Sequence, residues 1–346
     1  MMKTLIVDKE GKLSIQEIPK PKYNDNQALV KMIACGICNG TDTKIIHGDF
    51  KGVEESAYPL MLGHEGVGRV VEIGKNVKSF QVGDVVLLPF VDPDKEIYGE
   101  LGSAWGAYSE YGVVCDPKAS WENVPECAYA QTVVPKDIDP VDGAMIITLR
   151  EVLSAIQYFG IQKEKSVVVY GCGPVGLTFV KFLKLLGAGP IIAIDRHTEK
   201  LQNALKKGAD FALHAKECDV KEEVRGICPE GVSYVIDAIG NSDVINAAME
   251  LICDRGYICC YGISANCQMQ LDWSKAPYNW NLIFQQFPSK AEEGAVNEQI
   301  LFWIREGVID LKEYISDYVS FEEVVKGFEK LADKKISKKA IVVYKN

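Results

Sequence analysis

The second half of the chain alternates short apolar strands with helices, and this order restricts the fold more than any other feature. The run Val167–Tyr170 is wholly apolar, and an apolar helix is predicted over Leu177–Leu186. Strands that are apolar on both faces are typical of a parallel sheet covered by helices. The series continues with a strand at 191–194, an amphipathic helix at 199–207, and strands at 234–236 and 257–260. We therefore predict an α/β fold with a doubly wound parallel sheet.

A glycine-rich turn joins the first of these strands to its helix. The sequence Gly171-Cys172-Gly173-Pro174-Val175-Gly176 fits the pattern G-x-G-x-x-G directly after an apolar strand. Glycines there permit a tight turn and a close approach of the backbone to a pyrophosphate, which the helix N-terminus also attracts. The pattern predicts dinucleotide binding by Gly171, Gly173, Pro174, Val175 and Gly176. The alternative is a glycine turn in some other kind of α/β protein.

An acidic residue follows at the end of the second strand. Asp195 lies 19 residues after Gly176, where a carboxylate binds the two hydroxyls of an adenosine ribose. A 2'-phosphate would meet this negative charge, so the sequence favours NAD over NADP. Arg196 weakens the inference, because an arginine there can pair with a phosphate. In the alternative interpretation Asp195 is only a helix N-cap.

The first part of the chain has a different pattern. From about Lys3 to Asp116, short apolar runs such as Val67–Ile73 and Val82–Leu88 are separated by Gly, Asp, Asn and Pro. Short strands at this spacing predict a compact antiparallel barrel or sandwich. Helical periodicity begins only after Asp139, over Val141–Phe159. At 346 residues the chain is long enough for two domains.

Charge and composition restrict the partners and the compartment. The formal net charge of -10 and the lack of Lys/Arg clusters oppose binding to nucleic acid or to a membrane surface. The first residues reach Asp8 too early for a secretory segment, and no uncharged apolar run approaches the ~18 residues of a spanning helix. We expect a cytoplasmic protein in which most of the eleven cysteines are reduced. Eight of them are interpreted as small buried or half-buried residues: Cys127, Cys172, Cys218, Cys228, Cys253, Cys259, Cys260 and Cys267.

Three residues of the first part form a candidate metal site. Cys38 follows Gly36-Ile37, and His64 and Glu65 stand within Gly63-His64-Glu65-Gly66-Val67-Gly68. A thiolate, an imidazole and a carboxylate are ligands that a catalytic zinc accepts while one position stays open. In the alternative interpretation, His64 is a hydrogen-bonded histidine of the barrel and Cys38 is a thiol of the core. Cys35 and Cys38 form a C-x-x-C pair, but no second pair of this kind follows in the sequence. Cys35 is therefore expected to point inward from a strand.

Taken together, the motifs resemble those of the zinc-dependent medium-chain dehydrogenase/reductase family. Beyond the metal and glycine motifs, the resemblance includes Gly40-Thr41-Asp42, Gly83-Asp84-Val85-Val86, Gly106-Ala107-Tyr108-Ser109-Glu110-Tyr111 and Val235-Ile236-Asp237-Ala238-Ile239-Gly240. It implies a GroES-like catalytic domain over residues 1–147 and 288–346 and a Rossmann NAD-binding domain over 148–287. It also implies that Cys38 and His64 bind zinc, that Glu65 binds zinc or lies just behind it, and that Thr41 relays the substrate proton.

The chain departs from the family pattern at three places. Asn39 adds one residue between the ligand Cys38 and the Thr41-Asp42 pair, which could displace Thr41, and Lys44 replaces a relay histidine. Ile147 stands where relatives have a further ligand, so Glu151, one helical turn onward, is a possible substitute. Only Cys115 lies between Asp84 and Ser120, whereas a structural tetrathiolate site needs four cysteines. We therefore expect one catalytic zinc and no structural zinc.

The resemblance implies reversible oxidation of an alcohol with NAD. In lacking the structural zinc lobe and in having Glu65, the chain resembles the polyol branch of the family. We therefore expect a secondary alcohol of a polyol or sugar alcohol as the substrate. Contacts to it could come from polar and aromatic residues that a surface loop would use equally well: Asp42, Lys44, Tyr98, Glu100 and Trp105.

Several alternatives stay open. The substrate could be an amino alcohol or a short secondary alcohol, and the protein could be a non-catalytic dinucleotide-binding protein or a zinc-free reductase. A homodimer or homotetramer is expected, because an apolar edge strand at Cys259–Gly262 or Leu282–Phe287 would otherwise be exposed.

Overall fold

The computed structural model describes residues 1–264, 266 and 268–345, which divide into two compact units. Unit 1 comprises residues 1–150 and 289–346, and unit 2 comprises residues 151–288. The unit boundaries fall inside helix α3 (Met145–Tyr158) and between Pro288 and Ser289. No helix in the described part of the chain combines the length and apolar character that crossing a membrane requires.

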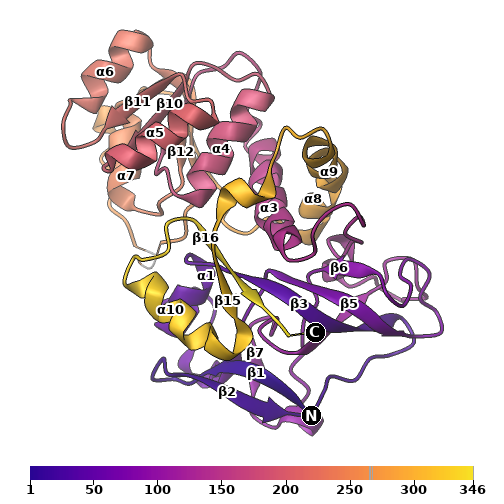
Figure 1. Cartoon of the computed structure of the whole chain (residues 1–346). Coiled ribbons are helices and arrows are strands. Elements are labelled where there is room, and N and C mark those ends of the chain that lie inside the picture. The colour runs from indigo at the N-terminus through magenta and orange to yellow at the C-terminus, as the bar shows by residue number, and fades with distance from the viewer. Residues whose placement is uncertain (265, 267, 346) are drawn as a thin grey trace. The chain divides into compact units, whose positions relative to one another are not determined.

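Unit 2 contains the predicted parallel sheet. Its strands run in the order β11-β10-β9-β12-β13-β14, and every paired neighbour is parallel. The strands are β9 (Val167–Tyr170), β10 (Ile191–Asp195), β11 (Phe211–His214), β12 (Val232–Asp237), β13 (Ile252–Cys260) and β14 (Asn281–Phe284). The helices are α4 (Pro174–Leu185), α5 (Thr198–Lys207), α6 (Val220–Ile227), α7 (Ser242–Met249) and a 3-10 turn, Trp273–Lys275. Figure 1 shows the helices packed around the strands. The α/β prediction is confirmed.

The strand order decides between the two alternatives for the apolar edge strand. Strand β13, which carries Cys259 and Cys260, pairs with β12 on one side and β14 on the other, so it is interior. The sheet ends at β11 and β14, and β14 agrees with the second alternative, Leu282–Phe287. An apolar run looks the same in an interior and an edge strand, since only long-range pairing separates the two.

Unit 1 is built from mostly antiparallel strands. One sheet has the order β2-β1-β4-β7, and the other has the order β15-β16-β3-β5-β6, with β8 also paired to β3. The strands are β1 (Met2–Val7), β2 (Leu13–Ile18), β3 (Gln27–Ile37), β4 (Leu60–Met61), β5 (Gly66–Ile73), β6 (Val85–Leu87), β7 (Gly102–Ser103), β8 (Tyr111–Cys115), β15 (Ile315–Ser320) and β16 (Lys339–Val343). The C-terminal strand β16 pairs antiparallel with β3, which brings Lys339–Val343 back to the N-terminal part of unit 1 (Figure 1).

Short helices lie between the strands of unit 1, contrary to the prediction that helices begin only after Asp139. Helices α1 (Thr41–Ile46) and α2 (Lys95–Tyr98) are too short to show a helical period in the sequence. The later helices are α8 (Lys290–Ala295), α9 (Asn297–Arg305) and α10 (Val324–Ala332). Single 3-10 turns span Glu55–Ala57, Glu126–Tyr129, Asp142–Ala144, Leu311–Tyr314 and Phe321–Glu323.

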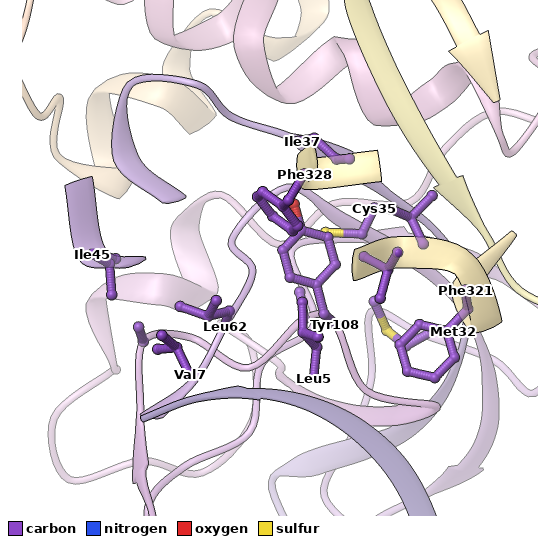
Figure 2. Packing of buried hydrophobic residues seen from close by; sticks show 14 of the residues in the cluster. Leu5, Val7, Met32, Cys35, Ile37, Ile45, Leu62, Tyr108, Phe321 and Phe328 are labelled. Atoms are coloured by element: carbon purple, nitrogen blue, oxygen red, sulfur yellow. The ribbon is translucent and has the colours of Figure 1, made fainter. Parts of the chain in front are cut away.

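The main core of unit 1 joins both of its sheets to helix α10. Figure 2 shows the ring of Tyr108 beside Phe328 in this cluster, and the two rings meet edge to face with centroids 5.8 Å apart. Cys35 is fully buried in the same cluster, which confirms that it points inward. The described cysteines are free thiols, and those predicted to be small buried or half-buried residues are so, whereas Cys267 lies outside the described residues.

Candidate metal centre and dinucleotide site

Pairing of β3 with β5 brings the predicted metal ligands together. Cys35 lies opposite Gly66, so Cys38, just after β3, meets His64 and Glu65, just before β5. The sulfur of Cys38, a ring nitrogen of His64 and a carboxylate oxygen of Glu65 all lie within 4.8 Å of one another. Glu65 is fully buried, while Cys38 and His64 are partly accessible.

Gly36 makes room for the carboxylate of this group. Its N–H donates to the backbone carbonyl of Glu65 at 3.1 Å, and a Cβ on Gly36 would lie 2.1 Å from Oε2 of Glu65. That oxygen is buried and accepts no hydrogen bond from the described residues. A buried carboxylate oxygen without a donor is costly unless a cation pairs with it. The donor set Cys, His and Glu therefore fits a zinc ion.

The carboxylate of Asp42 lies beside the imidazole of His64. It lies in the first turn of α1, with Oδ1 3.2 Å from Nδ1 of His64, while Oδ2 accepts hydrogen bonds from the Cys38 N–H and the Tyr108 hydroxyl. A carboxylate behind one ring nitrogen leaves the other, Nε2, for a metal. Burial by itself lowers the pKa of His64, but the charges and hydrogen bonds of Asp42 and Cys38 raise it well above its ordinary value. The negative field of the site thus favours a positive charge.

The extra residue Asn39 does not separate α1 from the site. Asp42 still reaches His64, and the N–H of Thr41 donates to the sulfur of Cys38 at 3.5 Å. Gly40 precedes the helix in right-handed helical backbone geometry, and a Cβ there would lie 3.8 Å from the same sulfur. The insertion is absorbed in the turn between Cys38 and α1.

The region around Ile147 supplies a hydroxyl in place of a ligand. Ile147 is fully buried, and Glu151 lies outside the Cys38, His64 and Glu65 group. The next residue, Thr148, donates to Oε1 of Glu65 at 3.4 Å. This contact was not predicted, because a threonine inside an apolar helix carries no metal-binding pattern.

Lys339 is the second contact that the sequence analysis missed. Its ammonium lies 2.5 Å from Oε1 of Glu65, and both side chains are buried. The sequence contained one indication, since Lys339 stands directly before the wholly apolar run Ala340–Val343. A lysine at the start of a buried strand needs an anionic partner.

The other side chains suggested as substrate contacts fall into three groups. Asp42 lies behind His64, and the ring of Trp105 lies against His64, with centroids 5.3 Å apart. Lys44 is half-buried on α1, and burial lowers its pKa. Tyr98 packs against a separate apolar cluster, and Glu100 is exposed in the following loop.

The glycine turn in unit 2 joins β9 to α4 as a tight turn, and dinucleotide binding there stays a prediction. Gly171 adopts a positive φ of 91° directly after β9, and a Cβ on Gly176 would lie 1.7 Å from the Gly171 carbonyl oxygen. A Cβ on Gly173 would meet nothing within 4 Å, so the turn is open on that side. Helix α4 begins at Pro174, and the first-turn N–H groups of Val175 and Gly176 lack helical partners.

Asp195 lies beside this turn at the end of β10. Its Oδ2 accepts a hydrogen bond from the Cys172 N–H at 2.8 Å, and Oδ1 accepts one from the His197 N–H at 3.0 Å. Both bonds hold the carboxylate next to the glycine turn. Arg196 is exposed.

Comparisons with known proteins identify the family of the chain. Residues 24–125 match the family described as alcohol dehydrogenase GroES-like domain, and residues 174–285 match the family described as zinc-binding dehydrogenase. An alcohol dehydrogenase of Geobacillus stearothermophilus is 32% identical over 241 residues, which cover 65% of this chain and 68% of the relative. A sorbitol dehydrogenase of Bacillus subtilis is 24% identical over 352 residues, which cover 100% of this chain and 98% of that protein.

A solved structure shares the fold over the whole chain. The 2R,3R-butanediol dehydrogenase from Bacillus subtilis superposes with a TM-score of 0.81 at 21% sequence identity, covering 99% of each chain. At this identity the likeness shows the fold alone. It confirms the predicted combination of a GroES-like unit and a Rossmann unit.

Proposed function

Because the chain belongs to the zinc-type alcohol dehydrogenase family of medium-chain dehydrogenases, we propose that it is a zinc-dependent, NAD-linked enzyme that reversibly oxidises a secondary alcohol to a ketone. Membership of the family makes it an oxidoreductase of alcohols. The substrate class that we propose is a polyol or sugar alcohol. The observation that carries the proposal is the Cys38, His64 and Glu65 group, with its ligand atoms within 4.8 Å of one another.

The proposed metal ligands are Sγ of Cys38, Nε2 of His64 and a carboxylate oxygen of Glu65, which would hold a single zinc. Bound there, zinc supplies a Lewis acid that lowers the pKa of a substrate hydroxyl or, in the reverse direction, polarises a carbonyl. Asp42 orients His64, and the N–H of Thr41 stabilises the Cys38 thiolate. We assign to the Thr41 hydroxyl the transfer of the substrate proton toward solvent.

The proposed cofactor site is the glycine turn of unit 2. A bound nicotinamide dinucleotide supplies the hydride acceptor. Gly171, Gly173, Pro174, Val175 and Gly176 would bind its pyrophosphate, and Asp195 with Arg196 would meet the adenosine ribose. The carboxylate of Asp195 favours NAD, because it would repel a 2'-phosphate.

The proposal extends to the organisation of the protein. Unit 1 would be the catalytic domain and unit 2 the NAD-binding domain. Among the described strands β14 pairs on one side only, which favours a homodimer or homotetramer formed through it. A single catalytic zinc would be present, because Cys115 is the one cysteine between Asp84 and Ser120.

Metal analysis combined with activity tests the proposal. We expect about one zinc per chain, NAD-dependent oxidation of polyols, and loss of activity after chelation that added zinc restores. Less than half a zinc per chain, with activity unaffected by chelation, would refute the zinc mechanism. Dinucleotide binding without any turnover would favour a non-catalytic protein.

A panel of substrates tests the proposed substrate class. Sorbitol and xylitol should give higher kcat/KM values than amino alcohols or short secondary alcohols such as 2-propanol. The opposite order would assign the enzyme to a different branch and leave the zinc and NAD proposals intact.

A further inference from the structure

Trp105 lies against one of the proposed metal ligands. The centroids of its ring and of the His64 imidazole are 5.3 Å apart, and the two planes are tilted by 51°. Trp105 is half-buried, whereas Asp42 and Glu65 are fully buried. The indole therefore packs against a proposed ligand while part of its residue stays accessible.

The backbone holds Trp105 in a conformation that a bulky residue rarely adopts. Its φ is 67°, and Gly106 follows with a φ of 72°. The N–H of Val91 donates to the Trp105 carbonyl at 2.8 Å, and a Cβ on Gly106 would lie 2.9 Å from the Cβ of Val91. Left-handed geometry at a side chain of this size costs free energy, and such residues cluster at functional sites. The strained turn thus fixes the indole beside His64.

From this geometry we propose that Trp105 is a specificity-determining residue whose indole packs against the carbon chain of a polyhydroxylated substrate. The inference rests on the proposed function. A hydroxyl bound beside Cys38 and His64 brings the carbon chain next to the indole. An aromatic face packs against the C–H groups of such a chain. A small alcohol would have little surface to place there.

The position of Trp105 is tested without any turnover. Co2+ bound by a thiolate absorbs in the near-ultraviolet, where tryptophan emits, so Co2+ added to the metal-free protein should quench an indole beside Cys38. We expect Co2+ to quench the wild type more than the Trp105→Phe variant. Trp121→Phe is the matched control, since the Trp121 indole donates to the Asp116 carbonyl. Equal quenching of wild type and Trp105→Phe would overturn the inference.

The specificity role is tested with substrates of two sizes. In Trp105→Ala we expect kcat/KM for sorbitol and xylitol to fall about tenfold or more, mainly through KM, with less than about a threefold change for 2-propanol. Trp105→Phe keeps an aromatic face and should stay within about threefold of the wild type for all three substrates.

Other outcomes overturn the proposal and identify what failed. An equal fall for all substrates, or loss of bound zinc from Trp105→Ala, would make Trp105 a structural support of His64. An unchanged polyol preference in Trp105→Ala would show that the indole does not contact the carbon chain of the substrate. If the wild type neither holds zinc nor oxidises alcohols, the proposed function itself fails, and the Co2+ measurement still decides whether Trp105 borders a metal site.

Discussion

The ammonium of Lys339 lies 2.5 Å from Oε1 of Glu65, although the two residues are 274 positions apart in the sequence. Strand β16 begins at Lys339, and its pairing with the end of β3 brings the lysine to the candidate metal centre. Oε1 of Glu65 is thereby neutralised, while Oε2 has no hydrogen-bond donor among the described residues. The return of the C-terminal segment to unit 1 thus sets the charge of the site.

Replacing Lys339 tests this pairing. Lys339→Met leaves the Glu65 carboxylate buried without its cation, so the metal-free protein should lose about 3 kcal/mol of unfolding free energy. Added zinc should recover part of this loss, because a second cation then faces the carboxylate. Urea unfolding with chelator and with zinc measures both values, and Lys339→Arg is the charge-preserving control. The same loss under both conditions would contradict a cation site at Glu65.

Asp42→Asn should weaken metal binding. The substitution removes the charge behind Nδ1 of His64 and the best acceptor for the Cys38 N–H. Loss of such an orienting carboxylate typically lowers metal affinity by about 10- to 100-fold. Competition with a fluorescent zinc chelator measures the affinity. Tyr108→Phe removes a single hydrogen bond to the same carboxylate and should have a much smaller effect.

Two glycines of the turn after β9 should respond differently to alanine. Gly173→Ala places a methyl group in open space at a φ of -73°, so the fold should be preserved while the bound pyrophosphate is displaced. Gly176→Ala places a Cβ 1.7 Å from the Gly171 carbonyl oxygen, so the turn itself must shift. Thermal unfolding and NADH titration should separate a binding defect from a folding defect. A normal NADH affinity in Gly173→Ala would contradict the proposed pyrophosphate position.

Asp195 should control the choice of dinucleotide. Asp195→Ser removes the carboxylate that would repel a 2'-phosphate, so the ratio of kcat/KM for NADP to that for NAD should rise about tenfold or more. Arg196→Ala is the opposing control and should lower that ratio. An unchanged ratio in Asp195→Ser would show that this carboxylate holds the turn through its bond to the Cys172 N–H and does not select the dinucleotide.

The carboxylate of Asp116 should make the stability of unit 1 depend on pH. Burial raises the pKa of this carboxyl, but N–H groups of Lys78, Ser79 and Lys118 donate to it and hold the pKa below its ordinary value. A lowered folded-state pKa stabilises the protein above the unfolded value of about 3.9, and the stabilisation is lost as the pH falls through the folded value.

Asp116→Asn is the comparison for this prediction. The free-energy difference between wild type and variant should be constant above about pH 5 and should shrink below about pH 4. Urea unfolding at a series of pH values measures it. A difference that stays constant down to pH 3 would show that Asp116 acts without its charge.

Local patterns were sufficient for much of the fold. The strand Val167–Tyr170 was predicted with its observed bounds, because a short apolar run that ends at a glycine-rich turn before a helix is typical of a buried strand. Helices α1 and α2 were not predicted, since four to six residues are too few to show a period. The long pattern at Val141–Phe159 was right in type, but its start is a 3-10 turn at Asp142–Ala144.

By itself the sequence determined the parallel sheet and the glycine turn, and it singled out Cys38, His64 and Glu65 as candidate metal ligands. These inferences depend on residue types at short spacing. Only the tertiary structure decided what surrounds them. Lys339, Thr148 and Trp105 reach the candidate metal centre from distant segments, through contacts that no local pattern records. Strand pairing and burial decide such contacts, because a buried charge or a strained turn acquires its partner only when the separate segments pack together.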